Sequence, residues 1–234
     1  MAKRSQSVSK SKLYEKAIKF FHMREKQLHQ IRALLDIRLN QLALAYTTEC
    51  KLPGESITVK TRVKTIDSFL KKLDKLHKDD FDFPDNCVYD LIGARVTCWF
   101  LDDCFGMARY ISNSNFISVE PENVYDYIQH PRPSGYRAIH IHGKISYENI
   151  STEGENVKSI PQKVTCEIQI RTKLMDTWAD LTHEFHYKAK DLGIEDHHLE
   201  RVLETQAKRF HSEDESFIAI RDMYQRMIAK KYDL

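Results

Sequence analysis

The sequence has few glycines, no long apolar run and almost no net charge. Its seven glycines among 234 residues form no Walker-type phosphate loop, so each glycine is expected to mark a local backbone requirement. No apolar stretch approaches membrane-spanning length, and the N-terminal residues lack the apolar centre of a signal peptide. Although 30% of the residues are charged, the net charge is only +2, which gives no overall field that would commit the chain to nucleic acid.

Signals for disulfides and for zinc are also missing. The five cysteines are odd in number and form no CxxC pair, which argues against a disulfide framework and against a zinc site. The segment His183-Glu-Phe-His186 does not match the HExxH zinc motif. We therefore expect reduced core thiols in a cytoplasmic protein.

Helical patterns occupy both ends of the chain. From about Ser11 to Thr48, apolar residues recur every three or four positions, as on one face of a helix: Ala17, Phe21, Leu28, Ile31, Leu35, Leu39, Leu42 and Ala45. A second helical segment is predicted from about Asp196 to Lys231. Residues 1–11 are polar and basic, which is typical of a flexible tail. The 41% of hydrophobic residues suffice for one large domain, expected over 12–190, with a helical extension over 191–234.

A strand-to-helix junction follows the first long helix. Residues 56–64 alternate as a strand, and Thr65 is placed to cap a helix whose inward residues would be Ile66, Phe69, Leu70, Leu73 and Leu76. Arg62, Lys64 and Ser68, with the free amides of the helix N-terminus, suit a phosphate chain. The alternative, a solvated lysine-rich helix, accounts less readily for cations that precede the helix.

A second strand is predicted over Asp90–Leu101, with Arg95 on the face opposite Ala94 and Val96. The carboxylate of Asp90 could hold a divalent cation, although a lone aspartate before a strand is more often a turn or cap residue. A further strand is predicted over 116–119.

A rigid loop containing two prolines, a serine and a glycine leads into a strand predicted over Tyr136–Ile145. A tyrosine at such a junction can stack on a nucleobase. Packing of Tyr136 on a neighbouring strand is the alternative, and without further support it is the default. Residues 151–156 are expected to form a flexible hairpin connection.

The segment 163–172 alternates strictly. Cys166, Ile168 and Ile170 would point one way, and Glu167, Gln169 and Arg171 the other. A solvated outer face would explain this alternation. A helix over 173–190 follows at once, however, and polar groups crowded at a strand-to-helix junction suit a cleft better. The order of helices and strands along the chain predicts an α+β fold, with helices covering a mixed sheet of about five strands.

Taken in order, four segments resemble the synthetase domain of RelA/SpoT-type alarmone enzymes, in the compact form of a stand-alone small alarmone synthetase. They are Arg62-Val-Lys-Thr-Ile-Asp-Ser68, Tyr89-Asp-Leu-Ile-Gly-Ala-Arg95, Pro133-Ser-Gly-Tyr-Arg-Ala-Ile-His140, and Glu167-Ile-Gln-Ile-Arg-Thr172 continuing to Trp178 and His183-Glu-Phe-His-Tyr-Lys188. Each segment is a weak signal alone, whereas four in this order are specific. The resemblance implies a nucleotidyltransferase-like fold with long N- and C-terminal helices.

The resemblance also implies a GTP/GDP diphosphokinase, which moves the β,γ-diphosphate of ATP to the ribose 3′-hydroxyl of GDP or GTP and releases AMP. The family pattern places Arg62 and Arg95 on the two faces of the adenine, and Lys64 and Ser68 on the ATP phosphates. Asp90 and Glu167 would hold Mg²⁺, and Glu167 would orient or deprotonate the acceptor hydroxyl. The acceptor side would comprise Tyr136, stacked on guanine, with His140, Gln169, Arg171 and Lys188.

Two other functions fit the same pattern. Some small relatives are toxins that pyrophosphorylate the tRNA 3′-CCA end or make adenosine alarmones, and the basic residues near both termini suit RNA, although scattered lysines are usually just solvated. A catalytically silent RNA-binding regulator is disfavoured because Lys64, Asp90 and Glu167 are all present. The resemblance further suggests a homotetramer joined through terminal helices and allows an antitoxin partner. No membrane partner is expected.

Overall fold

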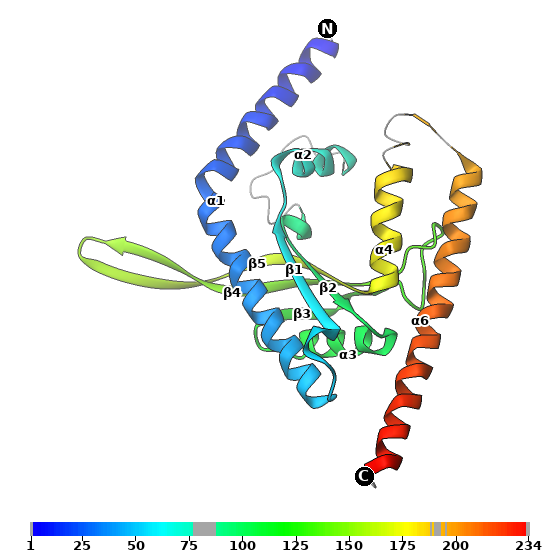
Figure 1. The fold of residues 1–234 in the computed structure, drawn as a ribbon. Coiled ribbons are helices and arrows are strands. Elements are labelled where there is room, and N and C mark those ends of the chain that lie inside the picture. Colours follow the sequence, from blue (N-terminus) through cyan, green and yellow to red (C-terminus); the bar gives the residue numbers. More distant parts are fainter. Residues whose placement is uncertain (1, 77–87, 188, 190–192, 195, 233–234) are drawn as a thin grey trace.

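The computed structural model describes residues 2–76, 88–187, 189, 193–194 and 196–232. These residues form a mixed sheet of five strands in the order β1-β2-β5-β4-β3, flanked by helices (Figure 1). The predicted α+β fold is therefore confirmed. The strands are β1 (Ile57–Val63), β2 (Ile92–Cys98), β3 (Ile117–Asp126), β4 (Ile139–Glu153) and β5 (Asn156–Thr172). The helices are α1 (Ala2–Glu49), α2 (Ile66–Lys75), α3 (Leu101–Ser112), α4 (Lys173–Leu181), its π-helical continuation (Thr182–Tyr187) and α6 (His197–Tyr232).

One face of the sheet is apolar and forms the core. Strands β2 and β5 pair in parallel, and the other neighbouring strands pair antiparallel. The alternate residues of β2, β4 and β5 that share this face are buried, and they pack in one cluster with side chains of α1 and α3. Because successive strand residues point to opposite faces, the polar alternates lie on the other face. A site built from these strands therefore belongs on the second face.

Helix α1 crosses the apolar face along much of its length. Leu28, Ile31, Leu35 and Leu39 are at most 2% exposed, as the apolar periodicity predicted. Farther along, Ala43 and Tyr46 are buried and Ala45 is exposed, so the prediction that Ala45 lies inward is wrong. The helix also continues back to Ala2 through the stretch predicted as a tail, because no glycine or proline interrupts it there. None of the described helices has a stretch both long and apolar enough to cross a lipid bilayer.

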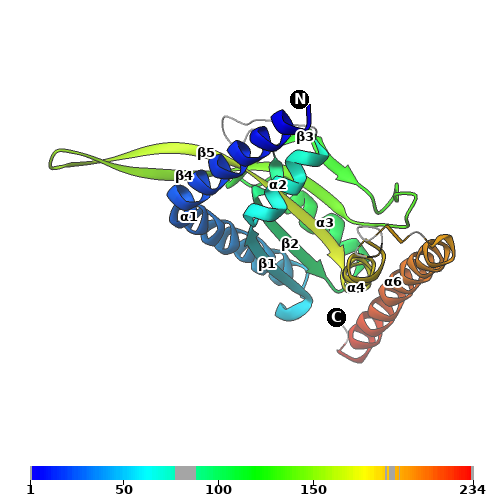
Figure 2. The same cartoon turned by 90° about the horizontal axis from the view of Figure 1, so that it is seen from above.

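Strands β4 and β5 extend into an arm that projects beyond the body of the molecule (Figures 1 and 2). They stay paired from Ile139 opposite Ile170 to Glu153 opposite Asn156. The turn is only Gly154 and Glu155, where Gly154 has a φ of +62°, a value that suits glycine. The hairpin connection predicted over 151–156 is therefore mostly strand.

Helices α2 and α6 start and end close to the predicted positions. Thr65 caps α2, and its side chain accepts a hydrogen bond from the Ser68 amide at 3.3 Å, as predicted. Leu76, which was predicted to point inward, follows the last turn of this helix and is 44% exposed. Helix α6, predicted over 196–231, packs against α4 and α3, and Trp178 Nε1 donates to the carbonyl of Leu203 at 2.8 Å. Helices α1 and α6 lie at opposite ends of the molecule (Figure 2).

Candidate functional site

Polar side chains form two rows across four strands of the sheet. Strand pairing aligns one residue from each of β1, β2, β5 and β4, and side chains aligned in this way share a face. The first row is Arg62, Gly93, Glu167 and His142, and the second is Lys60, Arg95, Gln169 and His140. The alternation along 163–172 thus places Glu167 in the row of Arg62, and Gln169 in the row of Lys60 and Arg95.

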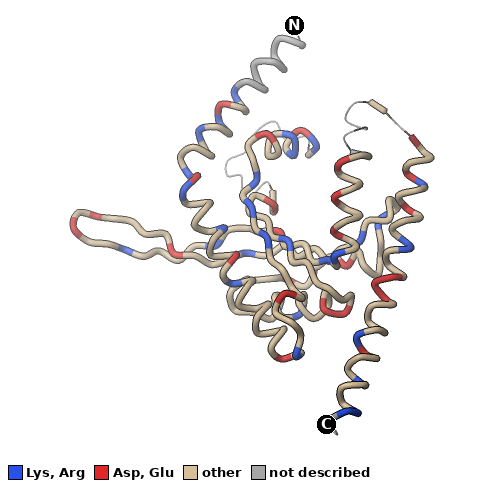
Figure 3. Tube along the Cα trace, viewed as in Figure 1, with Lys and Arg blue, Asp and Glu red and all other residues tan. Residues whose placement is uncertain are grey.

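A pocket of about 190 Å³, which we call the sheet pocket, opens on this face. Its lining residues are Lys60, Thr61, Arg62, Asp90, Gly93, Ala94, Arg95, Glu167 and Gln169. Arg62 and Arg95, predicted to contact a nucleotide base, and Asp90 and Glu167, predicted to hold a metal, therefore lie around one space. Basic residues also gather along β1 and on α2 next to the pocket (Figure 3).

Lys64 and Asp90 form an ion pair at the edge of the sheet pocket. Lys64 Nζ lies 2.6 Å from Asp90 Oδ2, and both side chains are largely buried. The other oxygen, Asp90 Oδ1, is buried and accepts no hydrogen bond within the described part of the chain, with Lys72 Nζ at 3.9 Å. Asp90 thus offers a carboxylate oxygen that none of the described residues hydrogen-bonds.

Glu167 is the second acidic group of the pocket. Its Oε1 lies 2.9 Å from His140 Nδ1 and accepts a hydrogen bond from Gln169 Nε2 at 3.0 Å. Burial by itself would raise the pKa of Glu167, but the hydrogen bonds from His140 and Gln169 outweigh burial and lower that pKa to about 2. Glu167 is therefore ionised at neutral pH.

Glu167 also belongs to a closed ring of polar contacts, the polar ring, which runs through His140, Tyr136, Arg171 and Gln169 back to Glu167. The Tyr136 hydroxyl lies 2.7 Å from His140 Nε2, and Arg171 Nη2 donates to that hydroxyl at 3.3 Å. Arg171 also donates to Gln169 Oε1, and Gln169 donates to Glu167. Because each member of the ring fixes the next, four of the five predicted acceptor residues, Tyr136, His140, Gln169 and Arg171, come together in one network.

Arg95 and Arg62 differ in their surroundings. Arg95 Nη1 lies 2.9 Å from Asp176 Oδ1 and 3.2 Å from Asp180 Oδ1, both on α4, whereas the side chain of Arg62 is exposed beside Gly93. The pairing of Arg95 fixes its guanidinium at the α4 side of the pocket. Ser68 is in the first turn of α2, outside the pocket lining, and Lys188 lies outside the described residues.

Sequence reasoning missed His142 and the two α4 carboxylates. His142 stacks on Tyr89, with ring centroids 4.5 Å apart and ring planes inclined by 10°. It follows His140 by two positions on β4, so the alternation that places His140 on the polar face also places His142 there. Asp176 and Asp180 are four residues apart on one helix, a spacing that puts both on one face.

The oxygen atoms of the sheet pocket fit Mg²⁺. Carboxylate oxygens are the ligands that this cation prefers. Asp90 Oδ1 is buried without a hydrogen bond from any described residue, and Glu167 is ionised on the same pocket. The donor set therefore has the charge and the oxygen chemistry for a divalent cation.

Comparison with known proteins places these segments in a family. Residues 61–192 match the family model described as a region found in RelA / SpoT proteins. The GTP pyrophosphokinase YwaC of Bacillus subtilis (strain 168) is 32% identical over 131 residues, which cover 55% of this chain and 57% of that protein. The GTP pyrophosphokinase YjbM of the same organism is 29% identical over 163 residues, covering 69% of this chain and 65% of that protein. The alignments thus span less than two thirds of the length of both relatives.

Solved structures agree with the fold. A GTP pyrophosphokinase family protein from Streptococcus pneumoniae has a TM-score of 0.72 at 26% identity, covering 89% of this chain and 96% of that one. Small alarmone synthetase 1 from Bacillus subtilis, solved bound to its product pppGpp, has a TM-score of 0.71 at 24% identity, with 88% and 99% covered. Since the matched region spans more than half of the sequence and includes Arg62, Asp90, Arg95 and Glu167 of the sheet pocket, the chain belongs to the family defined by the RelA/SpoT region.

Proposed function

We propose that this chain transfers the β,γ-diphosphate of ATP to the ribose 3′-hydroxyl of GDP or GTP, forming ppGpp or pppGpp and AMP. The observation that carries the proposal is the sheet pocket, where Asp90 and Glu167 meet Arg62 and Arg95. The names of the aligned relatives support the same reaction. In it, the acceptor 3′-oxygen bonds to the β-phosphorus as the bond from that phosphorus to the α,β-bridging oxygen breaks. The hydroxyl proton is lost and AMP leaves.

The donor side of the pocket is cationic. Arg62 and Arg95 would flank the adenine, since a planar guanidinium stacks on aromatic rings. Lys64 and Ser68 would contact the phosphates at the start of α2, where free amides and the helix dipole favour negative charge. Lys64 would then exchange its contact with Asp90 for a phosphate oxygen. Transfer of a phosphoryl-type group depends chiefly on such positioning and charge neutralisation.

Asp90 and Glu167 would hold Mg²⁺, which offsets the charge of the transferred diphosphate. Glu167 would also orient the acceptor hydroxyl. A carboxylate with a pKa of about 2 is a weak base at neutral pH, so orientation suits Glu167 better than proton abstraction does. Of the two roles that the family pattern implied for Glu167, we propose the first.

The acceptor side would be built on the polar ring. Burial raises the pKa of Tyr136, against the opposing effect of Arg171, so its phenol stays protonated and can hydrogen bond while its ring stacks on guanine. His140 and Gln169 would keep the Glu167 carboxylate in place, and Arg171 would hold Tyr136. Lys188 keeps its predicted role as a further acceptor contact.

We also propose that the protein acts in the cytoplasm as a homo-oligomer joined through its terminal helices. Exposed apolar side chains along α6 support this assembly, and they include Phe217, Ile220, Met223, Tyr224 and Met227.

A label-transfer assay tests the proposed function. The purified protein is incubated with γ-labelled ATP and Mg²⁺ and with GDP, GTP, ATP or bulk tRNA as the acceptor. Label is expected in a guanosine tetraphosphate or pentaphosphate. Label on tRNA or on an adenosine product would assign a different acceptor, and no transfer to any of the four would refute the enzymatic proposal.

Matched variants test the site. Asp90→Asn and Glu167→Gln remove one charge each and are expected to lower the transfer rate at least about 100-fold while the fold is kept. Glu120→Gln removes a charge from an exposed position on β3, outside the sheet pocket, and is expected to leave the rate unchanged. Retained activity in both site variants would contradict the assignment.

A further inference from the structure

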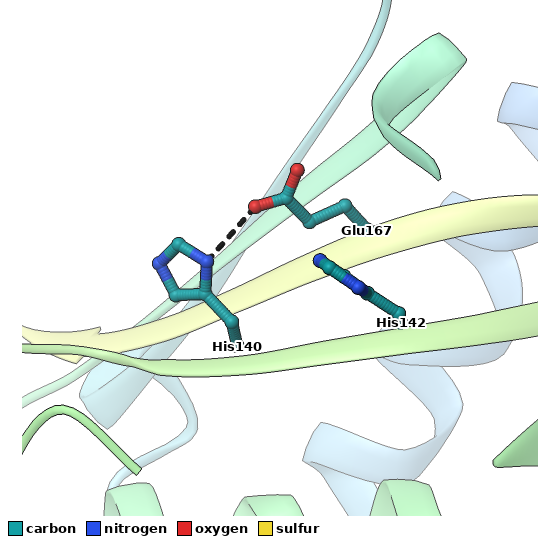
Figure 4. A group of neighbouring side chains, drawn as sticks. All are labelled: His140, His142 and Glu167. Atoms are coloured by element: carbon teal, nitrogen blue, oxygen red, sulfur yellow. Dashed lines mark ion pairs between the residues drawn. The ribbon is translucent and has the colours of Figure 1, made fainter. Parts of the chain in front are cut away.

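Two histidines and a glutamate form a compact cluster beside the sheet pocket. His140 and His142 are two residues apart on β4 and so lie on the same face of the sheet. Glu167 is the residue of β5 opposite His142. One potential ligand atom from each of the three lies within 4.8 Å of the other two (Figure 4). Within the described part of the chain, this is the one group of three histidine, cysteine, aspartate or glutamate side chains close enough to share an ion.

Each imidazole of the cluster is held in place by other groups. His140 Nδ1 faces Glu167, and His140 Nε2 faces the Tyr136 hydroxyl at 2.7 Å. A histidine that binds a metal through one nitrogen usually donates the proton on its other nitrogen to such a neighbour. His142 lies between two aromatic rings, stacked on Tyr89 and tilted against Tyr125 at 5.1 Å.

The donor set selects a different class of metal from the pair Asp90 and Glu167. Imidazole nitrogen suits Zn²⁺ and its transition-metal neighbours, whereas Mg²⁺ prefers oxygen ligands. Two histidines and one glutamate with an open fourth position is a ligand set that Zn²⁺ adopts in proteins.

We propose that His140, His142 and Glu167 bind a divalent transition-metal ion such as Zn²⁺, at a site that overlaps the proposed Mg²⁺ site through Glu167. Ligand atoms on one Zn²⁺ lie roughly 2.1 Å from the metal and hence roughly 3.4 Å apart. The cluster, with atoms up to 4.8 Å apart, needs small side-chain rotations to close. Binding of the metal through His140 Nδ1 requires the ring proton to be on Nε2, from which it donates a hydrogen bond to the Tyr136 hydroxyl oxygen.

Sharing Glu167 has a consequence for the proposed reaction. An ion in this cluster engages the carboxylate that would hold Mg²⁺ and the histidine that orients it, so Zn²⁺ is expected to inhibit the transfer. This consequence rests on the proposed function. Metal binding itself does not, because it needs only the three side chains.

Direct metal binding tests the proposal. Tag-free protein freed of metals is titrated with Co²⁺, whose visible absorption reports nitrogen and oxygen coordination, and then with Zn²⁺ in competition. One equivalent is expected to bind. His142→Phe keeps an aromatic ring beside Tyr89 but lacks a ligand nitrogen, so its affinity is expected to fall by more than about 10-fold. The matched control is His29→Phe, which removes an exposed histidine on α1 and is expected to bind like the parent protein.

Two further measurements complete the test. His142→Leu removes the same nitrogen without relying on ring stacking, and circular dichroism shows that each variant is folded. For each protein, the rate of label transfer with Zn²⁺ is divided by the rate without Zn²⁺. A difference in basal rate between the variants therefore does not affect the comparison. Equal Co²⁺ affinity and spectra in the parent and both His142 variants, or no Co²⁺ uptake by the parent, would overturn the proposal. A loss of binding with His142 supports it, even if no acceptor takes label.

Discussion

Asp214 is a carboxyl group held away from water where α6 meets the end of β5. It is 1% exposed, and Thr172 Oγ1 donates to its Oδ2 at 2.7 Å. Its Oδ1 has no hydrogen-bond partner among the described residues. Burial raises the pKa of Asp214 to about 6, and the hydrogen bond from Thr172 opposes this rise only in part. The aspartate pKa of the unfolded chain is about 3.9. Between about pH 4 and pH 6, Asp214 is therefore protonated in the folded protein and ionised in the unfolded chain.

The pH dependence of stability tests this effect. A raised carboxyl pKa contributes stability that is full below about pH 4 and is lost as the pH rises through about 6. Asp214→Asn cannot ionise, so at pH 7.5 it is expected to be more stable than the parent protein by about 1–3 kcal/mol. The difference should shrink as the pH falls and vanish below about pH 3.5. Urea unfolding at both pH values measures it, and a difference that stays constant with pH would contradict the assignment.

The sequence predicted which single residues belong to the site better than it predicted their contacts with one another. Alternation along 163–172 fixed the face of Glu167, and family resemblance supplied partners such as Arg62 and Asp90, which do line one pocket. His142 could have been found by the same alternation. The polar ring could not, because it depends on the register that sets His140 opposite Gln169, and spacing along one strand does not determine register.

Between elements, the approach of α3 to α1 depends on a glycine. A Cβ atom added to Gly106 would lie 2.3 Å from the Tyr46 hydroxyl oxygen and 2.4 Å from a ring carbon of Tyr46. The Tyr46 hydroxyl is itself fixed, because it donates to the buried Asp103 Oδ1 at 2.9 Å. Tyr46 therefore cannot move aside without breaking a buried hydrogen bond.

Gly106→Ala is expected to destabilise the fold by about 1–3 kcal/mol, since overpacking of a close contact outweighs the gain in helix propensity of about 1 kcal/mol. Gly54→Ala is the matched control. Nothing lies within 4 Å of the added Cβ at Gly54, so a change of less than about 0.5 kcal/mol is expected there. The free energies come from guanidinium unfolding. A stabilised Gly106→Ala protein would show that the two helices can separate slightly at no cost.

Elements were predicted best where one pattern dominated. The spans of α2 and α6 follow from apolar periodicity and capping residues. The β4–β5 arm was predicted too short, because its distal half lies outside the body of the molecule and has no buried face to impose alternation. The predicted strand over 116–119 was short for a related reason, since a register shift between Val119 and Val124 interrupts the pattern of β3.

Across the whole molecule, the order of strands in the sheet could not be read from the sequence. Strand β5 lies between β2 and β4, although β2 and β5 are far apart along the chain. This arrangement brings Gly93 of β2 beside Glu167 of β5. The apolar and polar pattern within each strand does not predict that the two strands are neighbours. The division into 12–190 and 191–234 stays a prediction.

The outer surface of α6 has a pattern that suits pairing with a second copy of itself. Phe217, Ile220, Tyr224 and Met227 are 38–65% exposed and recur at steps of three and four, as on one helix face. Acidic residues precede this stripe and basic residues follow it. An antiparallel pair centred on residue 222 would set Phe217 opposite Met227 and Ile220 opposite Tyr224. It would also bring the acidic part of each helix beside the basic part of the other, as a two-fold interface requires.

Ile220→Glu places a charge in the middle of this stripe, so it is expected to weaken self-association by at least about 10-fold, because a buried carboxylate would face apolar side chains of the partner. Gln225→Glu adds the same charge at an exposed position of α6 outside the stripe and is expected to leave assembly intact. Sedimentation equilibrium measures the mass, and circular dichroism checks that both variants keep their helix content. If the parent protein sediments as the 27.5 kDa monomer, or if Ile220→Glu assembles as the parent does, the stripe is not a subunit contact. If both variants lose assembly, association depends on the net charge of the helix and not on the stripe. A specific interface would be disrupted by a charge at position 220 but not by the same charge at position 225, five residues away.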